Sequence, residues 1–201
     1  MGQIRVFHMY QKVPAGFTSV DTTSKSGQWS GLSPFLLGPA QLYKDARWPA
    51  GLHAANFENL WQFAKVYHGH LDPKGDPTPD YWTWAKNGWA DTTPRRYPMG
   101  KGAAPAYSFW DGKKLGYIDA RKTIYGPIYA ALVQQTQSFT DLVTLAATTD
   151  IVLRDFDGYD HDTKGLSLSD VLNNPAKKCG HSFILKMLLT NDTAALGQFT
   201  P

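Results

Sequence analysis

The chain has 201 residues, of which 42% are hydrophobic and 13% aromatic, which is enough for one substantial domain with a packed core. Its net charge of +3 is too small, and its basic doublets are too scattered, to predict a dedicated nucleic-acid-binding protein. The single cysteine, Cys179, excludes an intramolecular disulfide, and no apolar run approaches the roughly 18 residues of a membrane span. We therefore expect a cytoplasmic protein that has no membrane partner.

The first third of the chain predicts one strand and one helix joined by loops. Residues 4–9 are β-prone and predict a strand, whereas residues 14–31 are rich in Gly, Ser, Thr and Lys and predict a loop. Residues 42–48 fit either a strand or a short helical turn. Asn56 is a good helix N-cap, and the helix that it begins should run to about residue 67 or 68.

The middle of the chain is rich in Pro and Trp. Residues 79–89 predict a helix that carries Trp82, Trp84 and Trp89, and residues 91–112 predict a long loop. Loops of this length inside a compact domain are often functional, so this one is a candidate to cover a site. We interpret residues 72–110 as an insert within a single domain that spans residues 1–201.

The remainder of the chain predicts mainly helices, over residues 115–137, 139–147, 167–173 and 178–189, with Ser138 or Thr140 as the cap of the second. A short buried strand is expected over residues 149–153, followed by an acidic loop over residues 155–165. The fold class predicted is α+β, mainly helical, in one compact domain with a few short strands.

Glu58, Gln62 and Lys65 have the spacing i, i+4, i+7 within the predicted helix. On a helix these side chains project within roughly 60° of one another, beside an apolar stripe that includes Leu60 and Trp61. The wall of a pocket forms at the edge of an apolar face. A carboxylate, an amide and an ammonium at that edge therefore predict a candidate site. The alternative is a solvated surface pair that contributes about 0.2–0.5 kcal/mol.

A second group of polar residues follows the predicted strand near residue 153. Asp155, Asp157, Asp160, His161 and Asp162 lie within eight residues. Acids at the end of a strand bind Mg²⁺ or act as bases, and Asp155 and Asp157 resemble the first motif of haloacid-dehalogenase phosphatases. The alternative is a solvated acidic turn. No familiar zinc spacing occurs, and we expect neither a metal nor a cofactor.

The order of these patterns resembles that of the NADAR (YbiA-like) family over residues 30–190. The resemblance rests on the Phe-Glu-x-x-x-Gln-x-x-Lys pattern at 57–65, on a preceding Ser-Pro-Phe segment at 33–35, and on Trp48. Helices, a short strand, an acidic turn and a last apolar helix follow in the order that the family shows. The chain departs from the family at residues 156–159, where an aromatic-Trp-Gly turn is replaced by Phe-Asp-Gly-Tyr, and in its long middle insert.

The resemblance implies an N-glycosidase that cleaves a ribose C1′–N bond in ADP-ribosyl, riboflavin-precursor or modified-nucleotide substrates. Glu58 would stabilise the oxocarbenium-like transition state or activate water, and Lys65 would keep Glu58 ionised, bind ribose or phosphate, or attack C1′. Asp155 and Asp157 are candidates for a second carboxylate. The substrate-binding candidates are Trp48, Trp61, Gln62, Trp82, Trp84 and Arg121.

Three other interpretations of the sequence remain. The first is a non-catalytic module that binds nucleotides or ADP-ribose on the same fold. The second is a Mg²⁺-dependent phosphatase that uses Asp155 and Asp157, and the third is an assembly protein with a Trp-rich interface. The expected partner is a small nucleotide-like molecule or a modified base in nucleic acid. The oligomeric state is left open.

Overall fold

The computed structural model describes residues 2–200 and has about 40% helix and 15% strand, which confirms the α+β class. Contacts within the chain define two compact units. Unit 1 comprises Met1–Leu36 and Arg121–Pro201, and unit 2 comprises Leu37–Ala120. Residues 72–110, predicted to be an insert, lie wholly within unit 2. The interpretation of the whole chain as a single domain stays a prediction.

Unit 1 is built on a three-stranded parallel sheet of order β1-β8-β2. β1 (Ile4–His8) and β2 (Thr18–Asp21) flank β8 (Ile151–Asp155), with Ile4 and Thr18 both in register with Ile151. The strand predicted over residues 4–9 is therefore confirmed as β1. The strand predicted over residues 149–153 is confirmed as β8, which lies two residues further along the chain. β2 lies inside the segment predicted to be a loop, because its Thr-Ser-Val-Asp sequence has one buried residue and becomes a strand only through pairing with β8.

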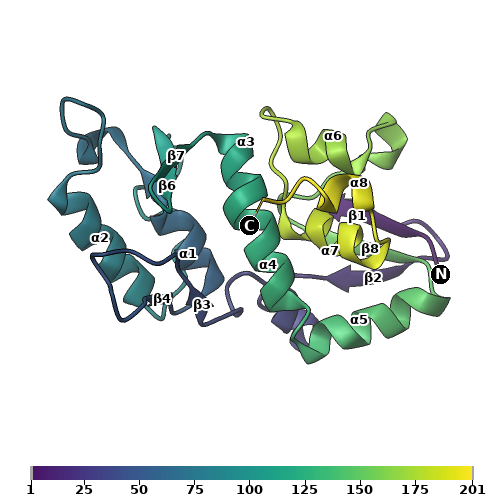
Figure 1. The fold of residues 1–201 in the computed structure, drawn as a ribbon. Helices are drawn as coiled ribbons and strands as arrows, with labels where there is room; N and C mark the ends of the chain where they lie inside the picture. The colour runs from purple at the N-terminus through teal and green to yellow at the C-terminus, as the bar shows by residue number, and fades with distance from the viewer. Residues whose placement is uncertain (1, 201) are drawn as a thin grey trace. The chain divides into compact units, whose positions relative to one another are not determined.

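Helix α7 (His181–Leu189) covers the sheet of unit 1, and its residues 181–187 are all buried (Figure 1). The other helical segments of this unit are η1 (Gly27–Leu32), η3 (Arg121–Tyr125, a π-helical turn), α4 (Gly126–Val133), α5 (Gln137–Thr148), η4 (Asp162–Lys164), α6 (Leu168–Asn173) and α8 (Thr193–Leu196). The cap of α5 is Thr136, which accepts from the Phe139 N–H, and not Ser138 or Thr140 as predicted.

Unit 2 combines two packed helices with two small antiparallel sheets. One sheet pairs β3 (Ala40–Gln41) with β4 (His53–Ala54), and the other has the order β5-β6-β7. The strands of the second sheet are β5 (Lys65–Val66), β6 (Tyr107–Trp110) and β7 (Lys113–Leu115). The helical segments are α1 (Phe57–Phe63), η2 (His68–His70), α2 (Pro79–Ala90) and α3 (Tyr117–Ala120).

Helices α1 and α2 pack closely in unit 2 (Figure 1). The contact is close because residue 88 is a glycine: a Cβ there would lie 2.0 Å from the Phe63 ring. Tyr81 of α2 is fully buried, and its hydroxyl donates to the Phe63 carbonyl oxygen over 3.1 Å. The core of this unit therefore lies along the buried face of the helix that carries Glu58.

Among residues 2–200, none of the helices has the length and apolar character needed to cross a membrane.

Candidate functional site

Helix α1 carries the first group of candidate residues. Asn56 caps it, as predicted, by accepting from the Asn59 N–H at 2.8 Å, and Glu58 lies in the first turn, where the helix dipole favours a negative charge. The helix ends at Phe63, however, and not at residue 67 or 68. Lys65 and Val66 pair instead with Ser108 and Tyr107 of β6, so strand pairing ends the helix before Lys65.

Glu58, Gln62 and Lys65 nevertheless form a continuous hydrogen-bonded chain. The Gln62 Nε2 group donates to Glu58 Oε1 at 2.9 Å, and Lys65 Nζ donates to Gln62 Oε1 at 2.6 Å. This polarity fixes the orientation of the Gln62 amide, because only its NH₂ can donate to a carboxylate and only its oxygen can accept from an ammonium. Glu58 and Gln62 are only 6% and 8% exposed, so the chain is largely shielded from water.

An indole ring lies beside the lysine end of this chain. Lys65 Nζ lies 4.7 Å from the centre of the Trp61 ring, within the range of a cation–π contact. A carboxylate, an amide, an ammonium and an aromatic ring are therefore linked in series within the eight residues from Glu58 to Lys65.

The other tryptophans predicted to bind substrate belong to an aromatic cluster in unit 2. Trp48 is buried and lies 6.0 Å from Trp82, ring centre to ring centre. The Arg47 guanidinium lies 3.3 Å from the centre of the Trp82 ring and covers one face of it. Trp84 packs against Phe63 and His70, and burial lowers the pKa of His70.

Asn59, which sequence reasoning did not single out, fixes the beginning of the long loop predicted over residues 91–112. Its side chain is fully buried, and Nδ2 donates to the carbonyl oxygens of Asp91 and Thr93 at 2.7 and 3.0 Å. Its Oδ1 accepts from the Arg95 N–H at 2.7 Å. Helix α1 thus carries the candidate catalytic residue Glu58, and the neighbouring Asn59 binds the beginning of the loop. The signal in the sequence was an Asn inside a helix, where this residue is disfavoured without a partner.

Asp155 and Asp157 belong to unit 1, at the carboxyl end of β8. Asp155 is 4% exposed, and its Oδ2 lies 3.2 Å from His181 Nδ1 at an angle too poor for a hydrogen bond. His181 Nε2 lies 3.0 Å from the Thr22 carbonyl oxygen, which can only accept, so Nε2 carries a proton. Asp155 therefore lies against His181, which joins the end of β8 to α7 and to Thr22, the residue that follows β2.

The remaining predicted residues of unit 1 also have protein partners. Asp157 lies 3.0 Å from Lys178 Nζ. The Arg121 guanidinium is buried and donates to the carbonyl oxygens of Leu172, Asn174 and Lys177 at the end of α6. A role of Arg121 in substrate binding stays a prediction.

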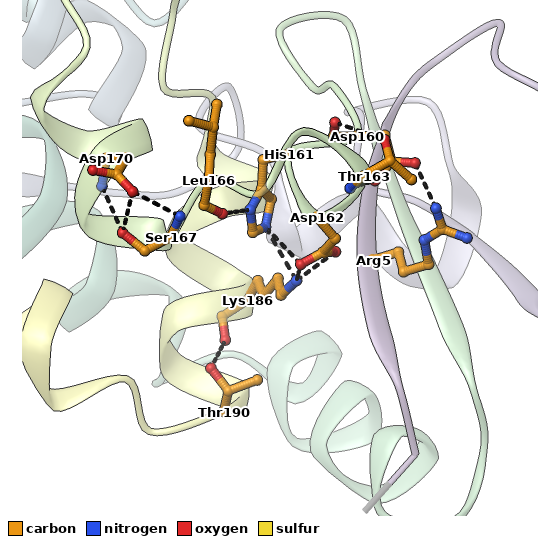
Figure 2. A network of polar contacts seen from close by, with 10 residues as sticks. All are labelled: Arg5, Asp160, His161, Asp162, Thr163, Leu166, Ser167, Asp170, Lys186 and Thr190. Atoms are coloured by element: carbon orange, nitrogen blue, oxygen red, sulfur yellow. Dashed lines mark hydrogen bonds and ion pairs between the residues drawn. The ribbon is translucent and has the colours of Figure 1, made fainter.

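A second polar network in unit 1 was not expected from the sequence (Figure 2). Lys186 Nζ donates to both carboxylate oxygens of Asp162 at 2.8 Å and lies 3.1 Å from His161 Nε2. His161 Nδ1 lies 2.7 Å from the Leu166 carbonyl oxygen, so Nδ1 carries the proton and Nε2 accepts from the lysine. All three hydrogens of this buried ammonium are used, which accounts for the network as structural.

Within residues 2–200, no group of three or more His, Cys, Asp or Glu side chains is arranged to hold a metal ion. The structure thus brings together Glu58, Trp61, Gln62 and Lys65 in unit 2, and it places Arg121, Asp155 and Asp157 in unit 1. No protein-family model, curated protein or solved structure matches this chain. The resemblance to the NADAR family therefore rests on the residue patterns alone.

Proposed function

We propose that the protein is an N-glycosidase that cleaves a ribose C1′–N bond of a nucleotide-like substrate, with Glu58 as the catalytic carboxylate. The observation that carries the proposal is the shielded chain from Glu58 through Gln62 to Lys65, beside the Trp61 ring. A structural surface pair would need neither the burial of the carboxylate nor the amide that joins it to the lysine.

The chemistry follows from the charge that develops during cleavage. Breaking the C1′–N bond places positive charge on the sugar, and a carboxylate shielded from water stabilises that charge more strongly than one in bulk solvent. Gln62 orients the Glu58 carboxylate, and the ammonium of Lys65 polarises that amide and favours the ionised form of the acid. The indole of Trp61 offers an apolar surface for a base or a sugar.

Replacing Glu58 tests the proposal. The variant Glu58→Gln keeps the size of the side chain and removes its charge, so release of free base should fall by about 10²–10⁴-fold while the thermal unfolding curve changes little. The matched control is Asp80→Asn, which makes the same chemical change at an exposed position in the first turn of α2.

The assay follows base or amine release from nucleosides, NAD, ADP-ribosylated guanosine and ribityl-type intermediates. The mechanism is wrong if Glu58→Gln retains the activity of the unaltered protein on a substrate that the protein cleaves, or if Asp80→Asn loses as much.

One observation favours a second candidate function, a module that binds nucleotides or ADP-ribose without cleaving them. Both residues proposed as a second carboxylate are paired within unit 1, Asp155 with His181 and Asp157 with Lys178. Calorimetry separates the two functions: heat of binding from a nucleotide that is recovered intact after long incubation supports the module, and its hydrolysis eliminates it.

A further inference from the structure

We propose that residues 95–101 form an arm that binds the phosphate and the base of a nucleotide unit. The proposal rests on the proposed function, because it assigns the charged and aromatic part of the ligand whose sugar would meet Glu58. It concerns the long middle insert, one of the two places at which this sequence departs from the NADAR pattern.

The first observation is that the chain is fixed, on both sides of the arm, to the segment that bears the candidate catalytic residues. At its beginning, the Arg95 N–H and the Asp91 and Thr93 carbonyls are bound by the fully buried Asn59. Five residues after the arm, the Ala106 N–H donates to the carbonyl oxygen of Val66, the residue after Lys65, at 2.8 Å.

These two attachments limit where the intervening residues can go. Since an extended chain spans at most about 3.5 Å per residue, no residue between 95 and 106 lies farther than about 20 Å from one of the two anchors. The arm is therefore tethered to the two residues, Asn59 and Val66, that directly follow Glu58 and Lys65 in the chain.

The second observation is the composition of the arm. Residues 95–101 include three cations, Arg95, Arg96 and Lys101, and no Asp or Glu. The Arg95 guanidinium is paired with Asp91 at 2.7 Å, so we assign phosphate binding to Arg96 and Lys101. Tyr97 and Met99 are 46% and 41% exposed, although both are large apolar side chains. Gly100 and Gly102, on either side of Lys101, both adopt a φ of +91°. This left-handed conformation favours glycine, so the sequence specifies the turn at Lys101.

The third observation is that a cation and a ring already lie together on this arm. The Arg96 guanidinium lies 5.6 Å from the centre of the Tyr97 ring. A guanidinium binds phosphate oxygens through two parallel hydrogen bonds, and an exposed aromatic ring stacks on a base. The pair matches the two recognisable parts of a nucleotide, which occur equally in a free nucleotide and in a single strand of nucleic acid.

The test compares the double variant Arg96→Ala/Lys101→Ala with the control Lys74→Ala/Lys113→Ala. The control removes the same charge from two exposed lysines of unit 2 that lie outside the arm. The probes are adenosine, AMP and a 12-nucleotide single strand, and their dissociation constants are measured by calorimetry or fluorescence anisotropy over a range of salt concentrations.

We expect the arm variant to weaken binding of AMP or of the strand by about tenfold or more at low salt, and to leave adenosine unchanged. The control should stay within about twofold of the unaltered protein. For a strand, the slope of log K against log salt should fall by about 1.4, since each lost phosphate contact contributes about 0.7. A strand as the natural ligand predicts tighter binding of the 12-mer than of AMP, whereas a mononucleotide predicts equal affinity.

The proposal is overturned if the unaltered protein binds AMP and the strand no better than adenosine, or if the arm variant and the control weaken binding equally. Failure of the proposed function is a separate result. In that case Glu58→Gln has no base release to abolish, yet phosphate-dependent binding through the arm persists.

Discussion

At the scale of single residues, Cys179 shows how burial decides reactivity. Its thiol lies in unit 1, where burial raises its pKa to about 12, with Asp155 adding to the rise and Arg121 opposing it. At neutral pH the residue is therefore a protonated thiol and a poor nucleophile. Cys179 is therefore a buried and unreactive side chain.

The raised pKa predicts a loss of stability at high pH. Because the folded protein holds the thiol proton more tightly than the unfolded chain, the stabilisation is complete below the ordinary pKa of 9.0 and is lost as pH rises toward about 12. The free energy of unfolding should fall more steeply above pH 9 in the unaltered protein than in Cys179→Ala, by up to about 1.4 kcal/mol per pH unit.

Urea unfolding at several pH values between about 7.5 and 10.5 measures this difference. Other buried groups with raised pKa values, such as Tyr81 and Tyr129, contribute equally to both proteins and cancel in the comparison. Parallel pH profiles for the two proteins would contradict the prediction.

The candidate site was predictable from sequence where its residues are close along the chain. The spacing of Glu58, Gln62 and Lys65 indicated a connected group, and the structure connects them through hydrogen bonds. The pairs Asp155–His181 and His161–Lys186 join residues about 25 positions apart. These partners come together only because α7 packs against the sheet and against the loop that follows β8. No pattern of neighbouring residues in the sequence predicts that packing.

At the scale of elements, the contact between α1 and α2 depends on a missing side chain. Alanine normally stabilises a helix interior by about 0.5–1 kcal/mol relative to glycine. At Gly88 the added methyl group would overlap the Phe63 ring, which is itself only 6% exposed and has little room to move.

We therefore predict that Gly88→Ala destabilises the protein by about 1–3 kcal/mol, in the direction opposite to helix propensity. Asn87→Ala is the control, because its side chain is exposed on the same helix and the change should stabilise by a few tenths of a kcal/mol, about 0.5 at most. Thermal or urea unfolding of the three proteins measures both effects, and a more stable Gly88→Ala protein would show that the two helices do not pack as described.

The helices over residues 79–89 and 139–147 were predicted closely, whereas the helix predicted over residues 115–137 is wrong: it is divided into α3, the π-helical turn η3 and α4, and it ends at Val133. The helix over residues 79–89 is α2 almost residue for residue. β2 and β6, each four residues long, lie in segments predicted to be loops. β2 takes its conformation from β8, which is distant in sequence, whereas β6 pairs both with β7, which follows it directly, and with the distant β5. The pairing of β5 with β6 also places Lys65 in a strand and not in the predicted helix.

At the scale of the whole molecule, the two units differ in how the chain builds them. Unit 2 is one continuous stretch with its own buried side chains, among them Phe57, Leu60, Tyr81 and Trp89. Unit 1 is assembled from two stretches, and its sheet needs both of them, since β1 and β2 come from the first and β8 from the second.

This difference predicts that a fragment of residues 37–120 folds alone, whereas a fragment of residues 121–201 does not, because β8 would lose both partner strands. Circular dichroism and the dispersion of amide resonances in NMR spectra distinguish the outcomes. A cooperative thermal transition of the first fragment supports two independently stable units. An unfolded first fragment would instead support the interpretation of the chain as a single domain.

The parallel pairing of β1 with β8 also sets an order of events during protein synthesis. At about 5–20 residues per second, the ribosome completes unit 2 several seconds before it delivers residue 155. Until then β1 and β2 lack the strand that separates them, and their edges are open to pairing with other chains. A nascent polypeptide of this protein is thus most exposed to aggregation after residue 120 and before residue 155 has been synthesised. A chaperone that shields the first 36 residues would act during this interval.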